Sequence, residues 1–236
     1  MAYQPFILFG TGHLLTLLMI FILSVFLPLY LKESSLIIKN NFGYILSVIM
    51  VIDQLLKPFY LHFYFDYPFM QVLPMHMCHL TTFSIAIFLI FRIRIFYDIA
   101  FFWAAAGGTM ALITPDVKLA FPHPLFISFF WGHGAILIAI GFASISLKNR
   151  PTIDSVKKCI LVSLGVMTFM LLVNKVLGPP ANYWYLGTRP DAVTIMNLLP
   201  SPPMHIPFLI GIGLICFAII YLPFWIYDKR LKMLNN

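Results

Sequence analysis

The segment His76-Met77-Cys78-His79 places one thiol between two imidazole side chains at the start of a long apolar run. The beginning of a helix and a nearby protonated histidine both stabilise a thiolate, which is a strong nucleophile. We therefore expect Cys78 to be a free, reactive thiol in the first turn of a helix, suited to forming a covalent intermediate.

A second candidate, His133, interrupts the apolar run from 124 to 147. Polar side chains inside a membrane helix are costly and are functional candidates by default, and an imidazole suits general acid–base chemistry. His133 lies deeper in its helix than Cys78 does, so the two can meet only if their helices pack together. The supporting candidates are His76, His79, Gln54, Asp53, Lys57, Asn174, Lys175, Asn182, Tyr183 and Arg189.

Several of these polar residues also have a purely structural interpretation. Asp53 and Lys57 are four residues apart and can neutralise each other on a helix. Lys175, near a helix end, can extend its ammonium toward the membrane surface. The other two cysteines, Cys159 and Cys216, are expected to be inert core residues, and no disulfide is expected.

The composition indicates a membrane protein. Of the 236 residues, 61% are hydrophobic and only 10% are charged, and the mean hydropathy is +0.93. Soluble domains are nearer half apolar and a quarter charged. The net charge of +7 is attributed to cytoplasmic loops rather than to a nucleic-acid surface, so we expect no nucleic-acid partner.

Seven apolar segments approach or exceed the roughly 20 residues that a helix needs to cross a bilayer. They predict an all-α membrane protein, a seven-helix bundle in which residues 1–236 form a single transmembrane domain. The predicted spans are about 10–31, 42–61, 76–92, 97–114, 124–147, 156–176 and 205–227.

The Lys and Arg residues predict the orientation, because cytoplasmic connections carry most of them. Eleven fall in one alternating set of connections and in the tail: Lys32, Lys39, Arg92, Arg94, Lys148, Arg150, Lys157, Lys158, Lys229, Arg230 and Lys232. Only Lys118 and Arg189 fall in the other set. This alternation supports seven spans in a plasma (inner) membrane, with the N-terminus outside and the C-terminus cytoplasmic.

With this topology, the candidate residues gather in the outer halves of the helices and the inner halves carry almost nothing comparable. We expect one polar cavity, open to the outer leaflet and facing the extracytoplasmic side. The loop 177–204 lies outside in this topology and contains the aromatic segment 183–185. We expect this loop to form an ordered lid over the bundle.

Four short motifs resemble one family of membrane proteins. The segment 73–78, Leu-Pro-Met-His-Met-Cys, is similar to the start of the third span in bacterial YwaF-like proteins. The segment 78–82, Cys-His-Leu-Thr-Thr, resembles an element of the related transmembrane protein 164 family. The segment 130–134, Phe-Trp-Gly-His-Gly, resembles the single-histidine motif, and 182–186 with the prolines at 200–203 resembles the loop before the last span.

This resemblance implies a phospholipid acyltransferase with a cysteine nucleophile and a histidine partner, roles that map to Cys78 and His133. It implies membrane phospholipids and lysophospholipids as partners, transfer of the acyl chain through a thioester to a lysolipid or to water, and no cofactor. Gln54, Asn174 or Asn182 would donate to the oxyanion. The phosphate would be held by cationic side chains, namely Lys57, Lys175 and Arg189. Gly132 and Gly134, which flank the histidine, and His76, a further candidate base, depart from the family pattern.

Alternatives remain open. The outer histidines with Cys78 could bind zinc in a metal-dependent lipid hydrolase, although residues spaced as 76, 78 and 79 do not easily point at one ion on a single helix. Asp53, Lys57 and Lys175 could instead be the coupling charges of a small-solute transporter. A purely structural or assembly role is the third alternative. The sequence does not decide the oligomeric state.

Overall fold

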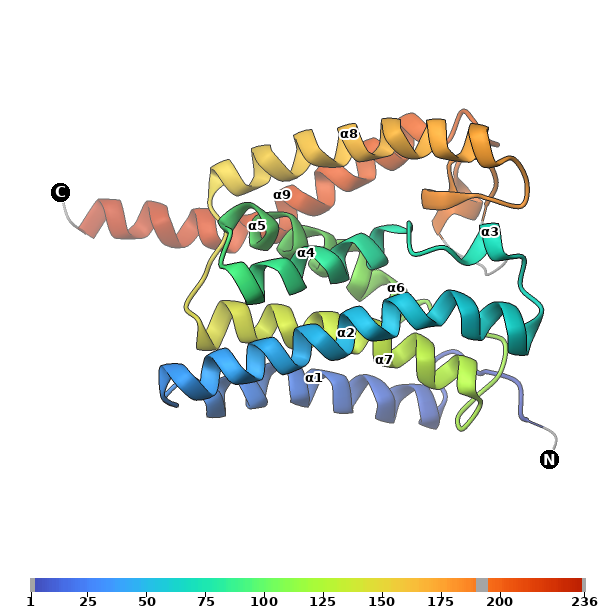
Figure 1. Cartoon of the computed structure of the whole chain (residues 1–236). Coiled ribbons are helices and arrows are strands. Elements are labelled where there is room, and N and C mark those ends of the chain that lie inside the picture. Colours follow the sequence, from blue (N-terminus) through green and yellow to red (C-terminus); the bar gives the residue numbers. More distant parts are fainter. Residues whose placement is uncertain (1–2, 190–194, 235–236) are drawn as a thin grey trace.

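The long helices follow the apolar runs of the sequence, as the computed structural model of residues 3–189 and 195–234 shows (Figure 1). Ser35 caps the start of one long helix, and a second long helix begins after its cap Thr152 and ends at Gly178 with φ 65°. The long helices are α1 (Thr11–Leu31), α2 (Leu36–Phe65), α4 (Met77–Phe91), α7 (Pro124–Gly141), α8 (Ile153–Leu177) and α9 (Ile206–Leu234).

Shorter elements complete the bundle. The helix α5 (Arg94–Trp103) continues through a π-helical turn, η1 (Ala104–Gly108), into α6 (Thr109–Ile113), and η2 (Phe142–Ser146) extends α7. The remaining short helices are α3 (Phe69–Val72), η3 (Tyr183–Tyr185) and η4 (Ile195–Leu198). The described residues contain no strand, only an isolated bridge between Pro5 and Leu119.

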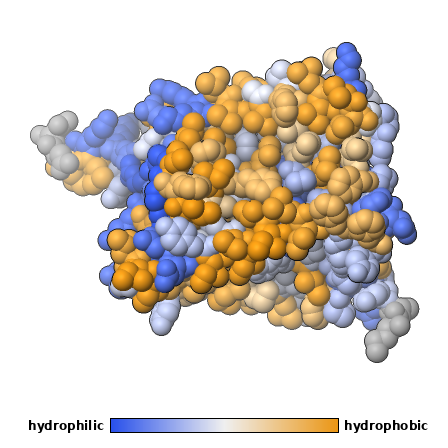
Figure 2. Space-filling model, viewed as in Figure 1, coloured by the Kyte–Doolittle hydropathy of each residue, from blue (hydrophilic) through white to orange (hydrophobic). Residues whose placement is uncertain are grey.

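Six helices in the described part of the chain are long and apolar enough to cross a membrane. They are α1, α2, the continuous helix Arg94–Ile113, α7 with η2, α8 and α9. Apolar side chains cover the middle of the visible face, and hydrophilic ones gather toward its ends (Figure 2). The segment predicted as the third span, α4, is apolar but has only 15 residues.

The core lies around α4, α5 and α7. Side chains from these helices, including Leu89, Tyr97 and Ala139, are completely buried. The apolar windows of α8 and α9 are only 6% and 11% buried, against 50% for Arg94–Ile113. Few apolar side chains of α8 and α9 are therefore fully buried, and the exposed ones among them suit contact with lipid.

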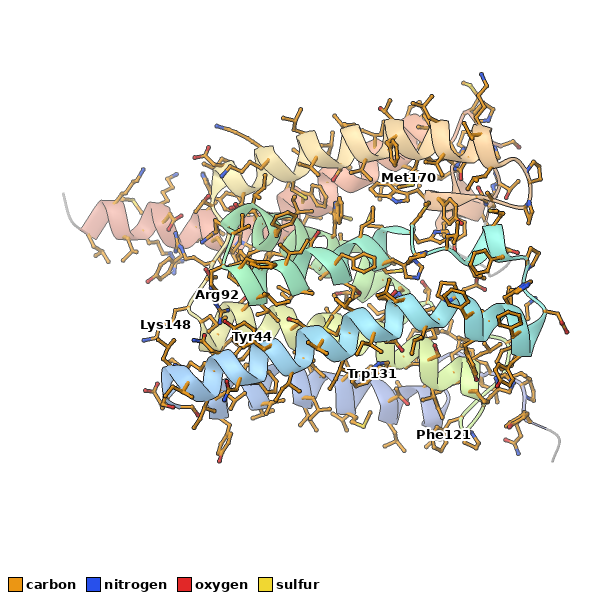
Figure 3. All side chains as sticks on the ribbon, viewed as in Figure 1. Tyr44, Arg92, Phe121, Trp131, Lys148 and Met170 are labelled. Atoms are coloured by element: carbon orange, nitrogen blue, oxygen red, sulfur yellow. The ribbon has the colours of Figure 1, made fainter. Side chains whose placement is uncertain are left out.

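The basic connections meet at one end of the bundle. The Arg92 guanidinium donates to Asn40 Oδ1 at 2.8 Å, Arg94 donates to the Arg150 carbonyl, and Arg150 pairs with Asp228. Arg92 and Lys148 lie at the end from which α9 projects, and Phe121 lies toward the other (Figure 3). The N-terminus and the loop after α8 also lie at that other end (Figure 1). Several of the basic connections thus lie at one end of the bundle.

One expectation about the inner halves of the helices is wrong, because Asp98 on α5 lies near the basic end and is 1% exposed. Its Oδ1 accepts from Arg94 Nε at 2.7 Å and from Ser155 Oγ at 2.8 Å, and its Oδ2 lies 3.8 Å from Lys158 Nζ. The carboxylate thus joins the starts of α5 and α8, where α5 packs on α8. A buried charge is tolerated because it is paired and hydrogen-bonded.

We expect Asp98→Asn to lower the stability of the bundle by about 1–3 kcal/mol, because the variant leaves two cations without their shared counterion. The thermal unfolding midpoint in detergent measures this. Asp154→Asn is the matched control, since Asp154 is exposed beside exposed Lys157, and such pairs contribute at most about 1 kcal/mol. Equal shifts in the two variants would contradict a structural role for Asp98.

Candidate functional site

A largely apolar cavity of about 560 Å³ lies between α2, α4, α7, α8, α9 and η1. Cys78, His79 and His133 all line it, together with Gln54 and Lys57. The helices that carry Cys78 and His133 are in contact, because α4 packs on α7, as a shared site requires. The structure thus brings together residues that are far apart in the sequence and lie on three different helices.

The short length of α4 explains why Cys78 lies deep enough to share a cavity with His133. At 1.5 Å per residue, the 15 residues of α4 span about 22 Å, well short of a bilayer core of about 30 Å. Arg92 at its end is tied to Asn40 at the start of α2, which has 30 residues. The first turn of α4 is therefore recessed below the opposite end of the bundle. Cys78 is half-buried there, and all three cysteines of the chain are free.

The hydrogen bond of His133 fixes which of its nitrogens faces the cavity as an acceptor. Nδ1 lies 2.9 Å from the Phe129 carbonyl oxygen. A carbonyl only accepts, so Nδ1 carries the proton and the neutral ring keeps a lone pair on Nε2. The Phe129 ring lies against the imidazole at 4.4 Å between centroids. His133 is thus held in the form that a general base requires.

Of the two glycines that flank His133, only Gly134 lies where an added Cβ would be crowded. A Cβ on Gly132 would lie 3.8 Å from Lys57 Nζ and 4.0 Å from Gln54 Nε2. A Cβ on Gly134 would lie 3.0 Å from Ile20 on α1. Close packing of α1 on α7 therefore explains a glycine at position 134, whereas the space at position 132 would admit an alanine.

His79 has the opposite arrangement to His133. The backbone N–H of His76 donates to His79 Nδ1 at 3.2 Å. In the neutral ring the proton therefore sits on Nε2, which makes this nitrogen a donor. The cavity thus holds a thiol, an imidazole that can accept a proton and an imidazole that can donate a hydrogen bond. These are the groups needed for acyl transfer through a thioester.

Gln54 lines the same cavity and is 4% exposed. Its Nε2 donates to Asp53 Oδ2 at 3.2 Å, which orients the amide, and its Oε1 is buried with no partner among the described residues. Gln54 thus presents an acceptor, and not the donor to the oxyanion that was predicted from the sequence. Asp53 lies beside Gln54 and lines neither this cavity nor the next.

A second, more polar cavity of about 980 Å³ adjoins the first. Lys57 and His76 line both. The predicted residues that line the second one are Asn174, Lys175, Asn182 and Arg189, together with these two. The predicted site residues thus fall into two groups: the thiol and imidazoles in the apolar cavity, and the cationic side chains in the polar one.

Some predicted residues build the loop after α8. The Asn174 side chain pairs with both the N–H and the carbonyl of Tyr183 at 2.8 and 2.9 Å. Asn182 accepts from the N–H groups of Gly187 and Thr188. Tyr183 is completely buried and its hydroxyl donates to the Met70 carbonyl, so it lines neither cavity. The amide groups of Asn174 and Asn182 are therefore engaged in holding the loop.

The loop reaches the apolar cavity through Trp184. Its indole N–H donates to the Met75 carbonyl at 3.1 Å, and its ring meets Trp103 edge-on at 5.7 Å. Trp184 and Leu186 line the first cavity. The described part of the predicted lid segment therefore forms part of the cavity wall. Residues 190–194 of that segment, including the proline after Arg189, lie outside the described residues.

Trp103 and Ser163, which were not among the residues predicted from the sequence, line the first cavity and are joined by a hydrogen bond of 2.8 Å. A tryptophan inside an apolar run is not distinguishable from core by its sequence. Lys118, which lines the second cavity, was used only to assign the orientation. The sequence signal for Lys118 was its position: it lies in a connection between spans, on the side predicted to carry few basic residues.

The remaining histidines have backbone partners. His13 Nε2 lies 2.8 Å from the Leu112 carbonyl, and His205 Nε2 lies 2.8 Å from that of Tyr185. His62 Nδ1 lies 2.8 Å from the Tyr67 carbonyl, and His123 caps the start of α7. Within residues 3–189 and 195–234, no group of three or more His, Cys, Asp or Glu side chains is placed to hold a metal ion.

Comparison with known proteins supplies the family. No curated protein and no solved structure matches the chain. The profile described as the TMEM164 family matches residues 8–221, which is most of the chain. This agrees with the resemblance that the segments 73–78, 78–82 and 130–134 carry. With its six long apolar helices, the chain is a multi-pass membrane protein that belongs to the TMEM164 family.

Proposed function

We propose that this protein is an integral membrane lipid acyltransferase. It moves an acyl chain from a phospholipid, through a thioester on Cys78, to a lysolipid or to water. The observation that carries the proposal is that Cys78, His79 and His133 line one largely apolar cavity, with His133 positioned as an acceptor and His79 as a donor. The apolar walls suit an acyl chain, and the chemistry needs no cofactor.

The membrane arrangement is part of the proposal. The chain crosses the membrane seven times, with α4 as the short third crossing, the N-terminus outside and the C-terminus in the cytoplasm. The basic residues that meet at the α9 end support this orientation, because cytoplasmic surfaces carry most Lys and Arg. The cavities then open toward the outer leaflet of a plasma membrane, and both lipids enter from that leaflet.

In the first half-reaction, His133 Nε2 takes the proton of the Cys78 thiol, and the sulfur attacks the carbonyl carbon of the lipid ester. The oxygen of the tetrahedral intermediate accepts a hydrogen bond from His79 Nε2. The bond from the carbonyl carbon to the glycerol oxygen then breaks, and the His133 imidazolium returns its proton to that oxygen. A lysolipid leaves and an acyl thioester remains on Cys78.

In the second half-reaction, His133 takes a proton from the incoming hydroxyl, whose oxygen attacks the thioester carbonyl. The carbon–sulfur bond breaks, and the proton passes to the Cys78 sulfur. When water is the acceptor, Gln54 Oε1, which is buried without a partner among the described residues, accepts from the O–H that His133 does not take. A lysolipid hydroxyl gives a new phospholipid, whereas water gives a free fatty acid.

Mass spectrometry of the intact protein, purified from membranes and incubated with phospholipid, tests the proposal. We expect an acyl adduct on Cys78 that hydroxylamine removes and that added lysolipid discharges. Cys78→Ala should lower turnover by roughly 10³-fold or more and should carry no adduct. Cys216→Ala is the matched control, because Cys216 is also a free, partly buried cysteine but lies outside the cavity.

An adduct that still forms on Cys78→Ala, or turnover that survives this substitution, would overturn the thioester proposal. The same holds if Cys78 stays unmodified with every phospholipid offered while the lipids bind. Metal analysis of the purified protein distinguishes the acyltransferase from a metal-dependent lipid hydrolase, since stoichiometric zinc without an adduct would favour the hydrolase.

A further inference from the structure

The second cavity carries an excess of positive charge among the residues that the structure describes. Asp116 is the one acidic side chain among its described lining residues. Four basic side chains line it. They are Lys57 on α2, Lys118 in the connection before α7, Lys175 on α8 and Arg189 in the loop that follows α8. A polar cavity with this balance attracts anions and repels a further cation.

Lys57 lies where the two cavities adjoin. It lines both, and its ammonium lies 3.8 Å from the position that a Cβ on Gly132 would take, beside the turn of α7 that carries His133. Its Nζ also lies 3.5 Å from the Ser128 carbonyl oxygen. A lipid with its ester at Cys78 would therefore pass its phosphate by Lys57 and extend its headgroup into the cationic cavity.

We infer that this cavity selects a phospholipid donor whose headgroup leaves the lipid with net negative charge. This inference rests on the proposed function, because it assigns the headgroup of the same acyl donor. The phosphate of any phospholipid can pair with Lys57. A zwitterionic headgroup then brings its own ammonium toward Lys175 and Arg189, where like charges repel, whereas a glycerol headgroup brings none.

Lys175 is the residue best suited to a test. It is exposed at the end of α8, so its substitution leaves the core intact. Arg189 is less suitable because it donates to the Leu199 carbonyl within the loop. Lys157 is the matched control, since it lies at the other end of α8, is equally a lysine, and is exposed.

The experiment uses the full chain with Cys78→Ala, which separates lipid binding from turnover. Native mass spectrometry in detergent compares phosphatidylglycerol, phosphatidylethanolamine and soluble glycerol phosphate as ligands. We expect phosphatidylglycerol to bind about fivefold more tightly than phosphatidylethanolamine. Lys175→Gln should reduce this preference to about twofold or less, and Lys157→Gln should leave it unchanged.

Equal binding of the two lipids would overturn the inference, as would a preference that Lys175→Gln leaves intact or that Lys157→Gln abolishes equally. Glycerol phosphate that binds as tightly as phosphatidylglycerol would identify a site for a free phosphate instead. The acyl adduct on wild-type Cys78 distinguishes the two proposals. If both lipids give equal amounts of adduct, the acyltransferase proposal stands and headgroup selection is rejected. If one lipid binds selectively but no adduct forms, headgroup selection stands and the acyltransferase proposal is rejected.

Discussion

Replacing His133 with glutamine is expected to slow acylation of Cys78 by about 10²- to 10⁴-fold, the usual contribution of a positioned acid–base group. The variant removes the nitrogen that takes the thiol proton and then returns it to the leaving glycerol oxygen. Single-turnover formation of the acyl adduct with a phospholipid donor measures the loss. His62→Gln is the control, because His62 lies at the end of α2 with a backbone partner and lines neither cavity.

A donor with a good leaving group sharpens the test of His133. A nitrophenyl ester needs no proton on its departing oxygen, so only the deprotonation of Cys78 depends on the histidine. We therefore expect the defect of His133→Gln to shrink with this donor and to shrink further as the pH rises and supplies thiolate. A defect of equal size with both donors, or a larger loss in His76→Gln, would assign the base elsewhere.

Much of the fold was predictable because apolar runs of about 20 residues leave few alternatives to a helix. The first predicted span, 10–31, matches Thr11–Leu31 closely. The second, 42–61, proved too short, since α2 runs from Leu36 to Phe65. Its polar ends, which include Lys39 and Asn40, stay helical although they interrupt the apolar pattern, so hydropathy alone underestimates the length.

The site was only partly predictable, because its chemistry depends on contacts between distant segments. The residues around Cys78 and His133 predicted these two as candidates, and both line one cavity. The proton positions on His79 and His133 depend on backbone partners that only the folded chain supplies. The burial of Asp98 likewise requires Ser155 and Lys158 from another helix, so its sequence neighbours could not reveal it.

The backbones of α1 and α7 lie so close together at Gly141 that no side chain fits between them. A Cβ placed on Gly141 would lie 2.1 Å from the Ser24 carbonyl oxygen and 3.4 Å from Pro28 Cγ. Pro28 lies four residues after Ser24 within α1 and has no N–H, so this carbonyl lacks its helical partner. The carbonyl turns toward α7 and fills the space that a side chain at Gly141 would occupy.

Gly141→Ala is therefore expected to destabilise the bundle by about 3 kcal/mol or more, because the clash is with backbone and the two helices must separate. The yield of monodisperse protein in detergent and its thermal midpoint measure this. Gly165→Ala is the matched control: nothing lies within 4 Å of its Cβ position on α8, and alanine in a helix interior is favoured over glycine by roughly 0.5–1 kcal/mol.

A double substitution tests the cause of the Gly141 clash. Pro28→Ala restores an N–H four residues after Ser24, so the carbonyl can pair within α1 and withdraw from α7. We expect Pro28→Ala to recover part of the stability that Gly141→Ala loses, a coupling that independent sites would not show. If Gly141→Ala and Gly165→Ala behave alike, or if Pro28→Ala adds its own loss without recovery, the freed carbonyl is not what keeps position 141 a glycine.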